Sequence, residues 1–272
     1  MIPAAFDYVR VGSPDEALAQ LAEHGDEAKL LAGGMSLLPL MKLRLATPAV
    51  LVDVGRLDDL SYVRDGGDHV AIGALTRHRD LETSEMLAEL CPPLHGVAAE
   101  VGDNQVRHRG TLGGSVAHGD PASDLPAVLL ALDATIVARG PAGERTIPAA
   151  EFFLGFLETA LGPDEMLTEL RVPKVRGARW AYQKFNRRAQ DWAIVGALAV
   201  RNGSTRVALV NMGATPLRAS GVEAALAGGA GDADAAERAA EGTEPPADLN
   251  ATPEFREHLA RVLVRRALEA SA

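Results

Sequence analysis

The hydrophobic pattern of this 272-residue chain changes its period several times. Apolar and polar residues alternate over Met166–Val172, as they do in a strand with one buried face. Elsewhere apolar residues recur at helical spacing, as they do over residues 253–271, and this spacing predicts amphipathic helices. Because both periods occur in the early, middle and late parts of the chain, we predict an α+β fold.

Residues 1–56 have the pattern of a compact β-α-β subdomain. Ser13 occupies the position of a helix N-cap, since a proline follows it directly and a glutamate comes one turn later. Buried strands are predicted over Lys29–Leu31 and Val50–Val54, with a helix over Leu37–Arg44 between them. Two more regions, 57–174 and 175–272, follow this unit.

The middle region alternates hairpins with short helices. Thr76 and Asp80 resemble a capping box that opens a helix, and the polar stretch 103–109 leads into a glycine-rich segment. Glu151–Phe156 is interpreted as a helical turn. In the last region we predict three antiparallel strands, at Trp180–Phe185, Ala193–Arg201 and Arg206–Met212. Three helices are predicted to follow them, at 217–228, 232–242 and 253–271.

Two segments carry paired glycines. In the first, Gly33 and Gly34 interrupt an apolar strand, and Ser36 then stands where the N-cap of the next helix belongs. A strand, a glycine turn and a helix start leave backbone N–H groups that can bind a diphosphate, although such a turn is often only structural. The second segment, Gly110–Ser115, again flanks a glycine pair with hydroxyls. Together the two segments suggest two walls of one nucleotide site.

Composition and charge narrow the class of protein. The formal charge of −10 argues against nucleic acid as the main partner. With Cys91 as its only cysteine, the chain cannot form an internal disulfide, an iron–sulfur cluster or a thiolate zinc site. No apolar run is long enough to span a bilayer, and the N-terminus lacks signal-peptide character, so we expect a cytoplasmic protein.

Several motifs now stand in one order, namely AGGMS at 32–36, MKLR at 41–44, LVDV at 51–54, TLGGS at 111–115, DPASDLP at 120–126 and KFNRRAQD at 184–191. Over essentially its whole length the chain resembles the FAD-binding medium subunit of molybdenum hydroxylases, the xanthine dehydrogenase and carbon monoxide dehydrogenase group. The resemblance implies an FAD-binding fold of the vanillyl-alcohol oxidase (PCMH) type. Residues 1–56 and 57–174 would be its two subdomains, and 175–272 a C-terminal α+β domain with a three-stranded antiparallel sheet.

The resemblance also implies partners. A large subunit would carry molybdopterin and oxidise the substrate, and a small subunit would carry two [2Fe–2S] clusters. The medium subunit would hold FAD non-covalently, take electrons from the clusters and pass them to an external acceptor. The unit would be a heterotrimer, usually doubled. We therefore expect no general acid or base and no metal site on this chain.

The site residues follow from the same resemblance. Backbone groups of Ala32, Gly33, Gly34, Met35 and Ser36 would bind the pyrophosphate, and Thr111, Leu112, Gly113, Gly114 and Ser115 would form the second wall. Met35 replaces the glutamine or histidine expected after the glycine pair. His118 and His108 are more simply interpreted as surface or supporting residues than as covalent FAD attachment points.

Four further residues have two interpretations each. Asp124 can cap a helix or bind the ribose, ribityl or adenine part of FAD, and Leu167 is either core or a flavin contact. Lys184 is either a solvated lysine or a cation beside the flavin that raises its reduction potential. Trp192 can lie over the flavin ring or pack on the C-terminal sheet, and Asp191 can hold that segment through a neighbouring arginine.

Two rival functions stay open at this point. One is a self-sufficient flavin oxidase or reductase with its own substrate pocket, although no convincing acid–base pair stands out in the sequence. The other is an assembly scaffold without FAD, which the intact glycines argue against. The substrate and the electron acceptor are not determined by this chain.

Overall fold

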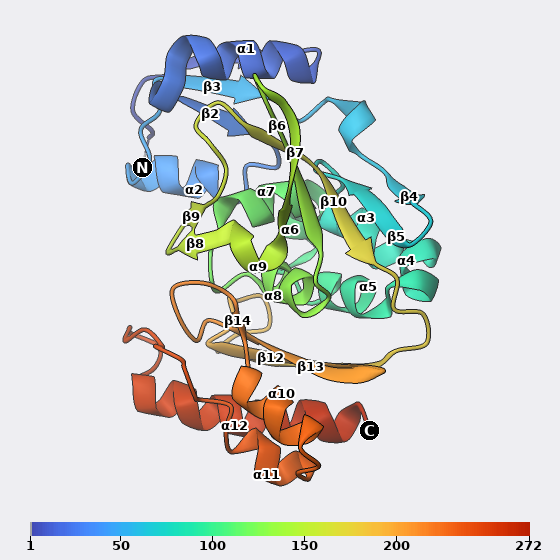
Figure 1. The fold of residues 1–272 in the computed structure, drawn as a ribbon. Helices are drawn as coiled ribbons and strands as arrows, with labels where there is room; N and C mark the ends of the chain where they lie inside the picture. The colour runs from blue at the N-terminus through green and yellow to red at the C-terminus, as the bar shows by residue number, and fades with distance from the viewer. Residues whose placement is uncertain (1) are drawn as a thin grey trace.

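The computed structural model describes residues 2–272, which fold into three stacked blocks of sheet and helix (Figure 1). In the first block the short strands β1 (Asp7–Arg10), β3 (Val50–Asp53) and β2 (Ala28–Leu31) form a parallel sheet in that order. The lead-in strand β1 therefore adds a third strand to the predicted β-α-β unit. The other elements of this block are α1 (Pro14–His24), η1 (Gly25–Glu27), α2 (Leu37–Leu43) and η2 (Asp58–Leu60).

The two ends and the buried face of helix α1 follow from its local sequence. The Ser13 hydroxyl accepts a hydrogen bond from the Glu16 N–H, as the N-cap pattern predicted. Ala17, Leu18 and Leu21 form its buried stripe and pack against the sheet. Gly25 ends the helix at a φ of 53°, a conformation that costs other residues more.

The middle block is built on a five-stranded antiparallel sheet of order β4-β5-β10-β6-β7. Its strands are β4 (Val63–Asp65), β5 (His69–Gly73), β6 (Thr135–Gly140), β7 (Gly143–Pro148) and β10 (Met166–Pro173), and a small hairpin adds β8 (Phe153–Gly155) and β9 (Glu158–Thr159). Its helices are α3 (His78–Thr83), α4 (Glu85–Leu90), α5 (Pro92–Ala98), α6 (Asn104–Arg109), α7 (Leu112–His118), α8 (Asp124–Ala131) and α9 (Ala149–Phe152).

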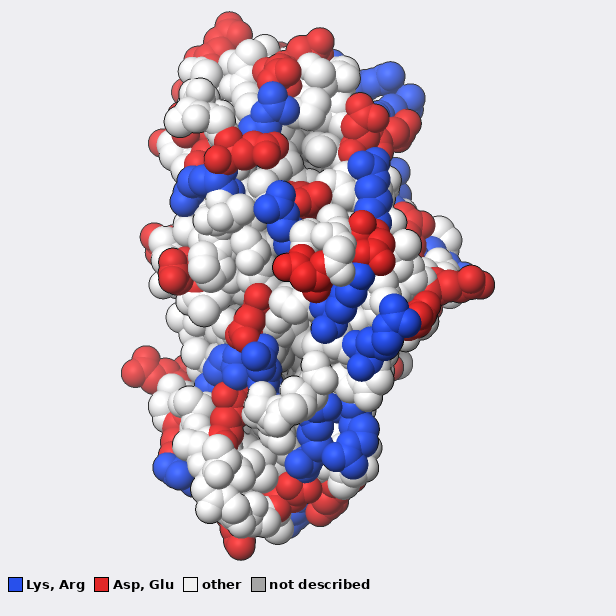
Figure 2. Space-filling model, turned by 45° about the vertical axis from the view of Figure 1, so that its right-hand side comes forward, with Lys and Arg blue, Asp and Glu red and all other residues white. Residues whose placement is uncertain are grey.

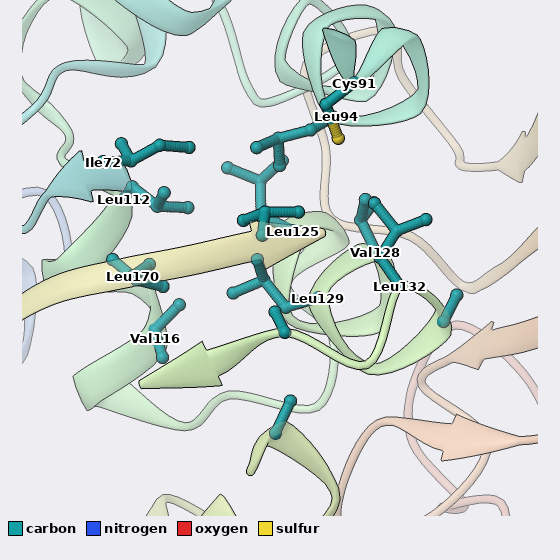
Figure 3. Close-up of a cluster of buried hydrophobic side chains, with 14 of the residues drawn as sticks. Ile72, Cys91, Leu94, Leu112, Val116, Leu125, Val128, Leu129, Leu132 and Leu170 are labelled. Carbon is teal, nitrogen blue, oxygen red and sulfur yellow. The ribbon is translucent and has the colours of Figure 1, made fainter. Parts of the chain in front are cut away.

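Figure 3 shows the core of this block, in which side chains from β5, β10, α5, α7 and α8 point toward one another. Every residue of α8 is buried, and all of them except Asp124 are apolar. Cys91 lies in the same cluster, where burial raises the pKa of its thiol to about 12. The thiol is therefore a packing group and not a nucleophile.

The last block is a sheet of order β11-β12-β13-β14 beneath α8 (Figure 1). Along β12, Leu198 and Val200 join the core that contains α8, whereas Ala197 and Ala199 join the core that contains the C-terminal helix. This alternation buries both faces of the sheet. The elements are β11 (Arg179–Phe185), β12 (Val195–Asn202), β13 (Ser204–Val210), β14 (Leu217–Arg218), α10 (Ser220–Ala227), α11 (Asp232–Ala236) and α12 (Pro253–Ala270).

The α+β class is confirmed, and several local predictions were wrong. Helix α6, in the polar stretch before Gly110, was not predicted; Asp103 caps it at the Val106 N–H. Arg77, and not Thr76, is the N-cap residue of α3, because the Thr76 hydroxyl bonds to Tyr62. The helix expected over 232–242 ends at Ala236. The predicted three-stranded sheet has β14 as a short fourth strand, and α9 ends before residues 153–155, which form β8.

On one face of the molecule, charged side chains of both signs lie close together. Figure 2 shows acidic and basic side chains interspersed over the face that it presents. Among residues 2–272, no helix is both long and apolar enough to cross a bilayer, and no cluster of histidine, cysteine and carboxylate side chains could hold a metal ion. The subdomain boundaries expected after residues 56 and 174 stay predictions.

Candidate cofactor site

A cavity of about 460 Å³ lies where the blocks meet, and both glycine segments line it. The cavity brings together almost all the predicted site residues: Ala32, Gly33, Gly34, Met35, Ser36, Thr111, Gly113, Gly114, Ser115, Asp124, Leu167, Lys184 and Trp192. Leu112 is the exception. Its side chain is fully buried in the middle core (Figure 3), so only its backbone can belong to the predicted second wall.

The first segment, residues 32–36, is an irregular loop between β2 and α2. Gly34 has a φ of 76°, which lets the chain reverse without steric cost. Within residues 2–272, the backbone N–H groups of these five residues donate to no protein acceptor. Ser36 is the N-cap residue of α2, as predicted, but its hydroxyl makes no capping bond within the described chain. A row of free donors at a helix start is suited to an anion.

The second segment has a different structure. Residues 112–118 are helix α7, and its glycines lie in the first turn and not in a loop. The N–H groups of Leu112 and Gly113 donate to the carbonyls of Thr76 and Ala74, at 3.0 and 2.9 Å. The Gly114 N–H donates to the Thr111 hydroxyl at 3.1 Å. This wall therefore shapes the cavity and offers fewer backbone donors than the sequence suggested.

The two segments touch each other. Gly33 packs so closely against the Arg109 carbonyl that a Cβ at this position would overlap with it. A Cβ at Gly114 would lie 3.7 Å from the Ala32 Cβ. Glycine is thus required because two backbones approach each other, in addition to any approach by a ligand. The paired glycines lie on adjacent surfaces of one cavity, as the sequence predicted.

A buried polar cluster forms another wall of the cavity. The Lys184 ammonium donates to the Asp124 carboxylate at 2.9 Å and to the Glu100 carbonyl at 2.9 Å, and the Tyr182 hydroxyl donates to the other Asp124 oxygen. The side chains of Lys184 and Asp124 are only 6% and 5% exposed. Burial raises the pKa of the Asp124 carboxyl, while Lys184 and Tyr182 oppose that shift.

This cluster decides between the interpretations of two residues. Lys184 is not a solvated lysine, because its ammonium is buried against a carboxylate. Asp124 does not cap α8, since Ser123 occupies the N-cap position and the Asp124 carboxylate faces β11. A buried cation at the cavity wall could act on a ligand there at low dielectric.

Trp192 lines two adjoining cavities. It is 55% exposed, and together with Asp191 it lines both the cavity described above and an adjoining one of about 710 Å³ next to the C-terminal sheet. Asp191 is held by Arg188 at 3.0 Å, as expected, and this ion pair lowers the pKa of the carboxyl. The indole is therefore placed where it could cover a ligand and also face a second molecule.

One histidine of the cavity was not singled out in the sequence analysis. His78, at the start of α3, lines the cavity, and burial lowers the pKa of its imidazole to about 4. Its Nδ1 has no hydrogen-bond partner within residues 2–272. The available signal was a histidine just after a buried strand, at a strand end where sites often form. His118 also lines the cavity and is half-buried, whereas His108 is not among the lining residues in the described chain.

Comparison with known proteins identifies the family. The model of the FAD binding domain in molybdopterin dehydrogenase matches residues 4–175, and that of the CO dehydrogenase flavoprotein C-terminal domain matches residues 180–271. The chain belongs to the family of FAD-binding subunits of molybdopterin dehydrogenases. FAD is the cofactor of this family's flavoprotein subunits, and they are oxidoreductase components.

Relatives of this family cover the whole chain. The carbon monoxide dehydrogenase medium chain of Hydrogenophaga pseudoflava is 42% identical over 100% of this chain and 98% of its own length. The glyceraldehyde dehydrogenase medium chain of Sulfolobus acidocaldarius is 36% identical over 99% of both chains. A solved carbon monoxide dehydrogenase structure from Hydrogenophaga pseudoflava superimposes with a TM-score of 0.96 at 43% identity, covering 100% of this chain and 98% of that chain.

The cavity fits FAD on the evidence of its own atoms. The free N–H groups of residues 32–36 suit a diphosphate, and a largely apolar wall that includes Leu167 suits a ring system. Lys184 supplies a buried positive charge at the same cavity. The site therefore offers the donor, apolar and cationic groups that a flavin dinucleotide needs.

Proposed function

We propose that this chain is the electron-transfer subunit of a molybdenum-containing hydroxylase or dehydrogenase. A large molybdopterin subunit would oxidise the substrate, and a small subunit with [2Fe–2S] clusters would deliver the electrons. This chain would pass them to an external acceptor from non-covalently bound FAD. The complex would be a dimer of heterotrimers in the cytoplasm, in keeping with the single cysteine, which cannot build a cluster on this chain.

The row of free N–H groups at residues 32–36 is the observation that carries the proposal. Free backbone donors at the start of a helix are suited to an anion, so they mark where an anionic cofactor would bind. Bound FAD would supply the conversion between two-electron and one-electron transfer. The chain would hold the diphosphate with residues 32–36 and shape the opposite side with residues 111–115.

Other residues would shift the reduction potential of that cofactor and limit access to it. Lys184, fixed by Asp124, would place a positive charge near the flavin and so favour its reduced form. Trp192 would cover the ring on the side of the adjoining cavity, from which an electron acceptor could approach. Leu167 would exclude water from the ring system.

The relatives do not indicate one substrate. Subunits of comparable similarity belong to complexes named for different substrates, carbon monoxide, glyceraldehyde and 6-hydroxypseudooxynicotine among them. This is expected if the substrate binds to another chain of the complex. We therefore leave the substrate out of the proposal and place its recognition in the large subunit.

Ligand binding by the purified full-length chain tests the proposal. If residues 32–36 bind the diphosphate, FAD should bind tightly and ADP weakly but measurably, whereas riboflavin should bind at least about a hundredfold more weakly than FAD. Flavin fluorescence quenching and calorimetry would measure the three affinities. Equal affinity for riboflavin and FAD would contradict the diphosphate site, and a colourless chain that binds none of them would support the scaffold alternative.

A second measurement separates the electron-transfer subunit from a self-sufficient enzyme. The isolated FAD-loaded chain should be reduced by dithionite, and candidate substrates should not reduce it without the partner chains. In the complex produced with its neighbouring subunits, the substrate should reduce the flavin. Reduction of the isolated chain by a small substrate would overturn the proposal in favour of the self-sufficient oxidoreductase.

A further inference from the structure

Arg77 connects two parts of the chain that lie beside the first glycine segment. Its guanidinium donates one hydrogen bond to the Arg109 carbonyl and another, at 3.4 Å, to the Gly55 carbonyl. Arg109 ends helix α6 just before the second segment, and Gly55 follows strand β3. One half-buried side chain thus ties the first block of the fold to the middle block.

Both of these acceptors belong to residues in contact with the first segment. The Arg109 carbonyl lies against Gly33 so closely that a Cβ there would overlap with it. A Cβ built on Gly55 would lie 3.1 Å from the Ala32 carbonyl, and the adjacent Val54 N–H donates to the Leu31 carbonyl at 3.1 Å. A shift of either carbonyl would therefore move the loop that carries the free N–H groups.

The backbone beside Arg77 holds the second segment as well. The His78 N–H donates to the Gly110 carbonyl at 3.1 Å, and the Leu112 N–H donates to the Thr76 carbonyl at 3.0 Å. Residues 76–78 thus fix the start of α7, while the Arg77 side chain reaches across to the first segment. Arg77 is not among the cavity-lining residues of the described chain, so its guanidinium acts through these carbonyls.

We propose that Arg77 is a positioning residue that sets the distance between the two glycine segments and so preorganises the donors of residues 32–36 for FAD. The inference rests on the function proposed above. An arginine is suited to this role because its planar fork of N–H groups can satisfy two carbonyls at once. A lysine would keep the charge but could hold only one of them in a fixed direction.

Arg77→Lys is the decisive variant, with Arg77→Gln beside it and Arg79→Ala as the matched control. Arg79 lies on the same helix but pairs with Glu82 at 3.1 Å and is 44% exposed. We expect the Kd for FAD to rise about tenfold or more in Arg77→Lys, the loss that one charge-assisted hydrogen bond represents, and to stay within about twofold in Arg79→Ala. Fluorescence titration of the full-length apoprotein would measure both.

Each outcome has a distinct meaning. Circular dichroism and the apoprotein Tm must be measured with the affinities, because a purely structural role would lower the Tm and leave the Kd of the folded fraction unchanged. If Arg77→Lys binds FAD as tightly as the wild type, charge alone suffices and the positioning role is refuted. If Arg77→Gln does not fold, the lysine variant still decides the question. If the wild-type chain binds no FAD, the proposed function fails instead.

Discussion

The two glycine segments resemble each other in sequence but differ in what their glycines do. In the first, the loop at 32–36 keeps its N–H groups free, and Gly34 adopts a positive φ. In the second, Gly113 lies inside a helical turn, and its N–H bonds to the carbonyl of Ala74. The N–H groups of the first segment are thus free for a ligand, whereas Gly113 of the second segment allows close packing against Ala74. A glycine pair therefore indicates close backbone approach, and only its surroundings show what approaches.

The largest expected effect comes from Gly113→Ala, with Gly114→Ala as its control. A Cβ at Gly113 would lie 2.6 to 2.8 Å from the Ala74 atoms, two of them backbone, which cannot rotate away. We expect a loss of about 3 kcal/mol in the free energy of unfolding, measured by urea denaturation of the apoprotein. At Gly114 the close atom is the Thr111 hydroxyl, so stability should change by less than about 1 kcal/mol.

This pair of variants tests the comparison directly. Gly114 lines the cavity, so its alanine variant should instead weaken FAD binding, which fluorescence titration would show. Equal loss of stability in both variants would mean that the second segment is packed alike at both glycines. The contrast between a packing glycine and a cavity-lining glycine would then be wrong.

A medium effect concerns His78, whose imidazole packs under Gly110 of the second segment. Because burial lowers its pKa from 6.5 to about 4, the unfolded chain binds a proton between pH 6.5 and pH 4 and the folded chain does not. Stability contributed by neutral His78 is therefore present above pH 6.5 and is lost as the pH falls toward 4. The loss should be about 2 kcal/mol at pH 5.

The His78→Gln variant isolates this contribution from that of the carboxylates. Its stability should fall less steeply than that of the wild type between pH 6.5 and pH 5, whatever its stability at pH 7. Urea denaturation at several pH values would give the two slopes. Parallel slopes would show that the imidazole titrates alike in the folded and unfolded chains and is not buried as described.

The smallest expected effect compares the hydroxyls that begin the two helices. The Thr111 hydroxyl accepts from the Gly114 N–H at 3.1 Å, so Thr111→Ala should cost about 1 kcal/mol. Ser36→Ala should cost close to nothing in the apoprotein, because its hydroxyl makes no capping bond within residues 2–272. Thermal unfolding of both variants would check this, and an equal Tm loss would mean that both segments begin their helices in the same way.

The sequence by itself determined the elements whose signals are local. Alternation over Met166–Val172 predicted the central strand β10, and the Ser13 cap predicted the start of α1, because both depend on residues close together in the chain. The spaced motifs also sufficed for the family, and hence for FAD. Helix α6 was missed, since its polar residues lack an apolar stripe and Asp103 is its main signal.

Only the tertiary structure decided how the individual site residues are placed and which groups they contact. Lys184 and Asp124 are 60 residues apart in the chain, so no local pattern could show that they form one buried pair. In the same way, Leu112 faces the core and Gly113 the Ala74 backbone because of how α7 lies on the middle sheet. The physical reason is that secondary-structure propensities and motifs depend on residues that are close together in the sequence. Burial and close backbone contact depend instead on segments that are far apart in the sequence and meet only in the folded chain.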